Sequence, residues 1–226
     1  MKRYLLLISM LAAFVAESAA REVYRLNDDW TFYFRSENSA DDARNITLPH
    51  TWYLDALAGG DIPNEMIPFA AKHAMVAIDV QTMLRWVENG GMVYHDWKEK
   101  KELLPYIRFL KTDAAEAEIL TGLTDRAEAA KLLHSWGAKE VLITHNTEVL
   151  AYDGERIYTC PIKARNLSGR TGRGDTTFAG YINERLTKDI PTALQTATAL
   201  VSLKMETPGP FTGTRQDVED YIKLMY

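Results

Sequence analysis

The sequence predicts an α/β fold with a mainly parallel sheet covered by helices. From about residue 61 onward, short apolar strand signals alternate with helical periods, and such alternation is typical of βαβ units. The composition agrees, because 46% hydrophobic and 25% charged residues are close to the average of globular domains. The chain of 226 residues therefore has the length and composition for one large domain or two small ones.

The elements of this region follow one another with few gaps. The predicted strands cover residues 75–80, 92–94, 107–110 and 141–144, and a hairpin follows at residues 149–152 and 156–160. The predicted helices cover residues 114–121 and 126–136, a segment after Asp175, and residues 192–205 and 215–224. Parallel strands need crossover helices between them, and this order supplies those helices.

Charge and cysteine content exclude several classes of protein. The net charge is −5, from 26 basic and 31 acidic residues, so no basic surface for a nucleic-acid partner is expected. Cys160 is the single cysteine, which excludes an intrachain disulfide, and no Cys/His cluster has the spacing of a zinc site.

The first twenty residues have the pattern of a secretory signal peptide. Lys2 and Arg3 precede an apolar run, and small residues follow at 18–20, where a cleavage site is expected. The apolar run is shorter than the roughly 20 residues of a membrane span, so no stable membrane anchor is predicted. The alternative is a buried N-terminal helix or strand.

Residues 21–60 form a second, polar and aromatic segment with predicted strands at 30–34 and 46–48. The stretches R-x-x-x-x-L-N-D-D-W-T-F and L-P-H-T-W resemble the start of glycoside hydrolase family 2, whose first domain is a β-sandwich. This short β-rich fragment carries no catalytic carboxylate of that family. Its aromatic residues suit core packing on short strands better than sugar stacking.

A glycine-rich loop at residues 168–174 leads directly into an amphipathic helix. Glycines let backbone N–H groups approach an anion closely, and the helix N-terminus behind them favours negative charge. Asp175 follows the loop, where a carboxylate can accept the proton of a hydroxyl that attacks a phosphate. The alternative is a glycine turn in which Asp175 is simply the N-cap of the helix.

The stretch T-G-R-G-D-T-T-F-A-G resembles the second signature of PfkB/ribokinase-like carbohydrate kinases, D-T-x-G-A-G-D-x-F-x-x-G. The resemblance implies that the backbone of Gly172, Arg173 and Gly174 forms the anion hole and that Asp175 is the catalytic base. Arg173 adds positive charge near the phosphates or points outward into solvent. The departures from the pattern are Gly169 for its first Asp, Arg170 for Thr, Arg173 for Ala, and Phe178 one residue late.

A second stretch, residues 111–122, resembles the K-x-N-x-x-E-x-x-x-L-x-G motif of the same family, with Asp113 in place of Asn. The resemblance implies that Glu116 and Asp113 act around Mg²⁺ and the phosphates, largely through water. The same two residues have the spacing of a capping box, and the two roles are compatible.

Two threonines complete the predicted site. Thr144 ends the predicted strand at 141–144, where the family has T-x-G-x-x-G, although Asn146 and Val149 replace both glycines. Thr198 lies in an Ala-rich helix that resembles the one beside the adenine of ATP, and plain packing is the alternative for that helix. These assignments predict Thr144 and Thr198 as nucleotide-binding residues.

The resemblance covers residues 61–226 and implies part of a ribokinase-like three-layer α/β/α fold. It also implies ATP and Mg²⁺ as cofactors, a small sugar or nucleoside as acceptor, and a cytoplasmic location, which conflicts with the predicted export. The N-terminal half with the small β lid is not visible, so residual sugar contacts are expected at most near Asp79 and Arg85; Asp79 is equally a loop cap. We therefore expect a truncated or chimeric chain with a junction near Gly59-Gly60.

Three functions remain open from the sequence. The first is ATP-dependent phosphorylation of a sugar or nucleoside hydroxyl. The second is that of an exported carbohydrate-binding or hydrolase-like fragment, and the third is a fusion without function. The sequence does not specify the acceptor or the oligomeric state.

Overall fold

The computed structural model describes residues 30–33, 43–46, 62–89 and 91–226. The predicted signal peptide and most of the segment at 21–60 lie outside these residues. Within that segment, strands β1 (Trp30–Tyr33) and β2 (Ala43–Ile46) form an antiparallel pair. The strand predicted at 30–34 is confirmed. The second strand ends at Ile46, where the predicted strand begins.

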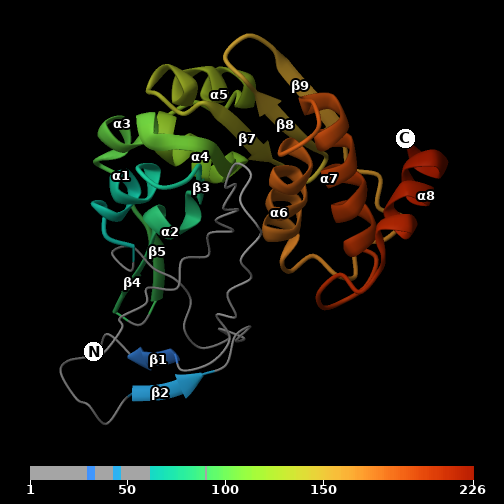
Figure 1. Cartoon of the computed structure of the whole chain (residues 1–226), viewed down its shortest axis with the longest axis horizontal. Coiled ribbons are helices and arrows are strands. Elements are labelled where there is room, and N and C mark those ends of the chain that lie inside the picture. The colour runs from blue at the N-terminus through green and yellow to red at the C-terminus, as the bar shows by residue number, and fades with distance from the viewer. Residues whose placement is uncertain (1–29, 34–42, 47–61, 90) are drawn as a thin grey trace.

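A five-stranded sheet in the order β3-β6-β7-β8-β9 forms the centre of the described fold (Figure 1). Its strands are β3 (Val76–Asp79), β6 (Ile107–Asp113), β7 (Glu140–Thr144), β8 (Glu148–Tyr152) and β9 (Ile157–Pro161). The first three strands are mutually parallel, and the last two add antiparallel pairings. The hairpin expected from the Asp153-Gly154 turn is therefore confirmed as β8 and β9.

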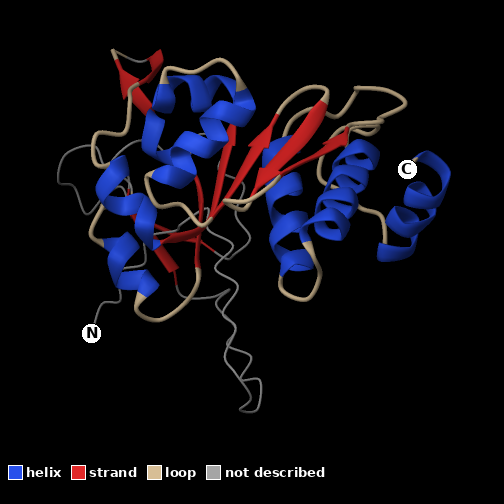
Figure 2. Cartoon of the chain, turned by 90° about the horizontal axis from the view of Figure 1, so that it is seen from above, coloured by secondary structure: helices blue, strands red, loops and turns tan. Residues whose placement is uncertain are grey.

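Helices cover both faces of this sheet (Figure 2). Side chains alternate along each strand, so Val141 and Ile143 join the core under α4 (Ala114–Thr121) and α5 (Arg126–Ser135). Leu142 joins the opposite core, against α6 (Arg173–Arg185) and α7 (Ile190–Lys204). The predicted three-layer α/β/α arrangement is confirmed.

Most of the longer helices begin with a capping side chain. An N-cap carboxylate or hydroxyl accepts a backbone N–H at α4, α5, α7 and α8 (Arg215–Met225), from Asp113, Asp125, Asp189 and Thr214 respectively. Helix α6 differs, because its N-cap is Gly172 and no side chain caps it. It begins at Arg173, which makes Asp175 its third residue. The alternative in which Asp175 is the N-cap is therefore wrong.

The segment before β6 holds the remaining described elements. They are α1 (Met66–Ala71), α2 (Gln81–Leu84), β4 (Arg85–Glu88), β5 (Gly91–Tyr94), α3 (Lys100–Leu103) and the 3₁₀ helix η2 (Leu104–Tyr106). The strand predicted at 92–94 exists as β5. It pairs with β4 in a separate antiparallel sheet rather than with the parallel strands, because only two residues separate β4 from β5 and a parallel crossover needs a dozen or more.

None of the helices among the described residues is both long and apolar enough to span a lipid bilayer.

Candidate functional site

Three parallel strands bring polar residues together at one edge of the sheet. Asp79 ends β3, Asp113 ends β6 and Thr144 ends β7. The register pairs Asp79 with Lys111 and Asp113 with Thr144, so these four residues lie along one edge. This is the carboxyl edge, where open α/β sheets bind their ligands.

The start of α6 lies against the same edge. A Cβ atom added to Gly174 would be 3.0 Å from Nζ of Lys111, so the backbone of the loop approaches the lysine closely. Gly172 has φ +76°, in the left-handed region that glycine adopts without strain. The structure thus places two residues of the predicted anion hole, Gly172 and Gly174, at the first turn of α6 beside a buried ammonium group.

The first turn of α6 offers unsatisfied backbone donors. The N–H group of Thr176 donates to the carbonyl of Gly172 at 3.0 Å, which is the first bond of the helix. The N–H groups of Arg173, Gly174 and Asp175 precede that bond and have no acceptor within the helix. Donors of this kind, together with the helix dipole, bind phosphate.

Asp175 stands exposed in this first turn, as the base of the predicted chemistry requires. Its charge affects groups on both sides of the turn. It adds a small repulsion to the burial that raises the pKa of Asp79, and it opposes the burial that lowers the pKa of Lys204. Asp175 therefore lies within electrostatic range of the strand edge and of α7.

Lys111 forms the centre of a buried ionic cluster. Its side chain is almost inaccessible, and Nζ donates to Oδ2 of Asp79 at 2.7 Å and lies 4.0 Å from Oε2 of Glu116. Burial would lower the pKa of Lys111, but the surrounding carboxylates outweigh it and raise that pKa. Asp79 also accepts the N–H of Gln81 at 3.2 Å, so it caps the following turn as well.

The capping box predicted for Asp113 and Glu116 is present. Oδ1 of Asp113 accepts the N–H of Glu116, and Oε2 of Glu116 accepts the N–H of Asp113, both at 2.8 Å. Burial raises the pKa of Glu116 to about 7, with Lys111 opposing this shift. Among the described residues, no group of three or more His, Cys, Asp or Glu is placed to hold a metal ion. The magnesium-linked role of Asp113 and Glu116 stays a prediction.

The raised pKa of Glu116 predicts a dependence of stability on pH. Folding raises the pKa of Glu116 from its ordinary 4.5 to about 7. Because this pKa is higher in the folded than in the unfolded chain, protonated Glu116 contributes its full share of the free energy of unfolding below about pH 4.5. This contribution is lost as the pH rises through about 7. We expect Glu116→Gln, which cannot ionise, to gain stability relative to the natural chain between pH 5 and pH 8, by at most about 3 kcal/mol.

Thermal unfolding of both chains without added metal at several pH values measures this difference. Glu128→Gln is a suitable control, because Glu128 is an exposed carboxylate in the first turn of α5. Identical pH profiles for Glu116→Gln and the natural chain would contradict the prediction.

Asn146 ties the loop after β7 to the loop before α6. Its Oδ1 accepts from Nη2 of Arg170 at 3.1 Å and from Nη1 of Arg173 at 2.6 Å. Burial lowers the pKa of Arg173, and repulsion by Arg170 adds to that effect. Two guanidinium groups are therefore held close together beside the anion loop, an arrangement that a bound anion would relieve.

The two predicted nucleotide residues are both buried. Thr144 lies at the strand edge, and its hydroxyl is 3.5 Å from the carbonyl oxygen of Thr112. Thr198 is inaccessible within α7, where Oγ1 donates to the carbonyl of Leu194 at 2.7 Å and the side chain contacts Cys160. The structure brings Thr144 to the site, whereas the side chain of Thr198 packs from α7 against Cys160 of β9. Their roles toward a nucleotide stay predictions.

Sequence reasoning assigned no role to two lysines that the structure places at this site. Lys111 and Lys204 are both buried, with side-chain nitrogens beside residues 169–174. A lysine inside the apolar strand 107–113 is the signal that could have identified Lys111. Lys204 gives no such signal, because a lysine in the last turn of a helix is ordinary.

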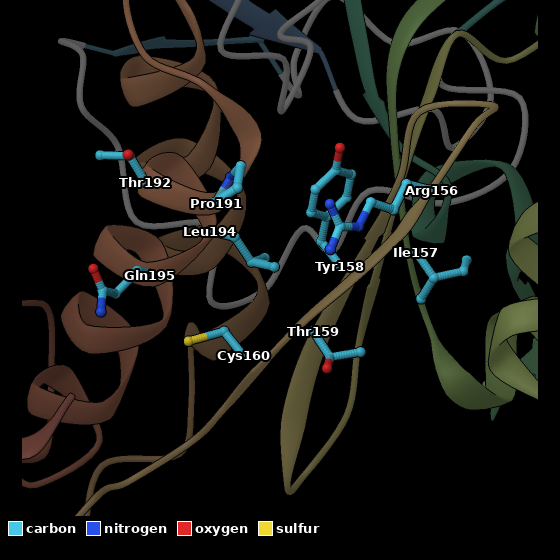
Figure 3. Close-up of a pocket in the computed structure, with 9 residues that line it drawn as sticks. All are labelled: Arg156, Ile157, Tyr158, Thr159, Cys160, Pro191, Thr192, Leu194 and Gln195. Atoms are coloured by element: carbon cyan, nitrogen blue, oxygen red, sulfur yellow. The ribbon is translucent and has the colours of Figure 1, made fainter.

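A hollow of about 500 Å³ lies elsewhere, between β9 and α7 (Figure 3). It is lined by Arg156, Ile157, Tyr158, Thr159, Cys160, Pro191, Thr192, Leu194 and Gln195. None of the candidate site residues lines it. The polar residues at the carboxyl edge and this hollow are thus at separate places.

Comparison with known proteins identifies the family of the chain. Residues 57–216 match the pfkB family of carbohydrate kinases. A cytidine kinase of Thermococcus kodakarensis is 35% identical over 85 residues, which cover 36% of this chain and 31% of that protein.

Solved structures give the same answer for the fold. A pyrophosphate-dependent kinase of the ribokinase family, complexed with a pyrophosphate analogue and myo-inositol, is 36% identical with a TM-score of 0.68, covering 73% of this chain and 60% of that one. Ribokinase of Arabidopsis thaliana, complexed with ribose and ATP, has 24% identity and a TM-score of 0.61, covering 73% and 54%, a likeness of fold alone.

This chain spans about a third of the curated cytidine kinase and 54–60% of the two structures. The family match itself covers more than half of the 226 residues, from residue 57 to residue 216. With the ribokinase-like sheet, the glycine N-terminus of α6 and Asp175 in its first turn, the chain belongs to the pfkB family of carbohydrate kinases.

Proposed function

We propose that this chain carries the phosphoryl-transfer half of a kinase that phosphorylates a hydroxyl group of a small sugar, polyol or nucleoside. One observation carries the proposal. The uncapped first turn of α6 presents backbone N–H groups and Asp175 at the carboxyl edge of the sheet, beside the ammonium group of Lys111. This arrangement supplies an anion site and a proton acceptor within one turn of helix.

The proposed reaction assigns a task to each of these groups. The acceptor hydroxyl gives its proton to the carboxylate of Asp175 while its oxygen forms a bond to the phosphorus. The bond from that phosphorus to the leaving oxygen of the donor breaks at the same centre. The N–H groups of Arg173 and Gly174 hold the oxygens of the transferred phosphoryl group and stabilise their charge.

Asp113 and Glu116 are the residues that would hold Mg²⁺. The capping box uses one oxygen of each carboxylate, Oδ1 and Oε2, and leaves the other for waters of a hydrated ion, which fits the preference of Mg²⁺ for water and few carboxylates. When bound, the ion would neutralise negative charge on the donor phosphates.

The donor is a phosphoanhydride, and two candidates follow. ATP is the donor that the resemblance to the family implies. Inorganic pyrophosphate is favoured by the pair of guanidinium groups of Arg170 and Arg173, which share Oδ1 of Asn146 beside the loop. Guanidinium forks bind phosphate oxygens in a bidentate manner. The pyrophosphate-dependent relative at 36% identity supports this second candidate.

Phosphoryl transfer from each donor to ribose, myo-inositol and cytidine tests both donors. If pyrophosphate is the donor, Arg170→Gln and Arg173→Gln each raise its KM about tenfold, the loss of one charge-assisted contact of about 1.4 kcal/mol. Arg156→Gln is the matched control, since Arg156 lies just before β9, is exposed and lines the separate hollow. Turnover with ATP alone, unaffected by the arginine variants, would reject pyrophosphate as the donor.

We also propose that residues 1–20 are a signal peptide and that residues 21–60 are a fragment related to glycoside hydrolase family 2. The support is the order of charged, apolar and small residues at the start and the L-N-D-D-W-T-F and L-P-H-T-W stretches. N-terminal sequencing of the expressed protein tests the first proposal, because removal of the peptide leaves Arg21 as the first residue. An intact Met1 start in a host competent for export would reject it.

A further inference from the structure

Lys204 is a buried cation without a carboxylate partner. Its side chain is only 1% exposed, at the last residue of α7. The ammonium group donates to the carbonyl of Gly169 at 2.6 Å and to the carbonyl of Thr171. No salt bridge found in the described part of the chain includes Lys204, and Asp175 is the acidic group that acts on it electrostatically. Burial lowers the pKa of this ammonium group, and no local ion pair neutralises its charge.

The loop that receives this ammonium group lies directly on the end of α7. The N–H of Gly169 donates to the carbonyl of Met205 at 2.8 Å, and the hydroxyl of Ser168 donates to the carbonyl of Glu206 at 2.7 Å. A Cβ atom at position 169 would lie 1.7 Å from the carbonyl oxygen of Thr207, so the backbones are in direct contact. Residues 168–171 are thus fixed from one side.

The direction of the two carbonyls fixes the direction of the neighbouring amides. In a trans peptide the C=O and the following N–H point to opposite sides. Because the carbonyls of Gly169 and Thr171 point toward Lys204, the N–H groups of Arg170 and Gly172 point away from it. Those two amides lie within three residues of the start of α6, where the donor phosphates are proposed to bind.

We propose that Lys204 is a positioning residue, a built-in cation that orients the anion loop (residues 168–174) for the phosphoryl donor. The ammonium group holds two loop carbonyls inward, so that loop amides face the donor. It also places an unpaired positive charge beneath the loop, where a donor anion benefits from it. This inference rests on the proposed function of the same loop, but the orientation of the loop can be measured without catalysis.

The test compares Lys204→Met with the natural chain in two measurements. The first is hydrogen exchange of the Gly169 amide, whose bond to Met205 reports the seating of the loop. The second is calorimetric binding of inorganic pyrophosphate. We expect faster exchange at Gly169, unchanged exchange in β6 and β7, and at least tenfold weaker binding of pyrophosphate, about 1.4 kcal/mol.

Lys163→Met is the matched control, because Nζ of Lys163 also donates to a backbone carbonyl, that of Met225, away from the loop. Lys204→Ala supplies a second variant, in which methylammonium ions are expected to restore binding of pyrophosphate by occupying the space of the lost ammonium group. Lys204→Arg, which keeps the charge, is expected to retain more binding than Lys204→Met.

Each outcome decides the inference. Pyrophosphate binding within twofold of the natural chain in Lys204→Met, or equal losses in Lys204→Met and Lys163→Met, would overturn it. A natural chain that binds no pyrophosphate would overturn the charge assigned to the donor site. If the natural chain transfers no phosphoryl group while the exchange and binding effects are present, the proposed function fails and the positioning role stands. If the natural chain transfers a phosphoryl group but Lys204→Met shows no change in exchange or binding, only the positioning role is rejected.

Discussion

Asp175→Asn is expected to reduce phosphoryl transfer by about 10²–10⁴-fold, the usual contribution of a positioned general base. Asparagine has the same size and shape but cannot accept the proton of the acceptor hydroxyl. Asp175 is exposed at the third position of α6, so its replacement removes no buried contact. The measurement is kcat for transfer, with donor binding measured separately by calorimetry.

The expected pattern is a fall in kcat with donor binding preserved. Asp217→Asn is the matched control, because Asp217 occupies the same third position in α8, and it controls for the charge at a helix N-terminus. Full activity of Asp175→Asn would remove Asp175 from the mechanism. A loss of donor binding equal to the loss of activity would assign it to binding instead.

Lys111→Met is expected to destabilise the folded chain by about 3–5 kcal/mol, the cost of removing one partner from a buried ion pair. The substitution leaves Asp79 without its 2.7 Å partner and leaves the buried Glu116 without a nearby cation. Urea denaturation at pH 8 measures the change. The loss should be smaller at pH 5, where Glu116, with a pKa of about 7, is protonated.

Lys223→Met provides the comparison for Lys111→Met. Lys223 pairs with Asp220 on the exposed face of α8, where both side chains are largely accessible, so little change in the unfolding midpoint is expected. A Lys111→Met chain as stable as the Lys223→Met chain would show that the buried cluster does not hold the strand edge together.

The central sheet and its helices could be predicted because their signals are local. The continuous buried run of β7 and the turn between β8 and β9 are each encoded in consecutive residues. The capping box of Asp113 and Glu116 is local in the same way, since three positions separate its members. The start of α6 is harder to predict, because its N-cap is a glycine and no capping side chain marks the boundary.

The buried cations of the site could not be predicted, because their partners are distant in sequence. Lys111 meets Asp79 across 32 residues, and Lys204 meets Gly169 across 35. No periodicity or spacing rule connects such pairs; only the assembled sheet and the packing of α7 on the loop bring them together. The placement of β5 outside the main sheet could not be predicted from its own residues either. It depends on the pairing of β5 with β4.

The contact at Gly169 restricts the routes by which this sequence can change. The family pattern has an aspartate at this position, but a Cβ atom here would lie 1.7 Å from the carbonyl oxygen of Thr207. An aspartate at position 169 is therefore accessible only after the turn at 205–208 has moved away. The carbonyl oxygen of Gly169 itself accepts a hydrogen bond from Lys204. We therefore expect residues 169 and 204 to be substituted together or not at all. A double-mutant cycle of these two residues should accordingly show strong non-additivity.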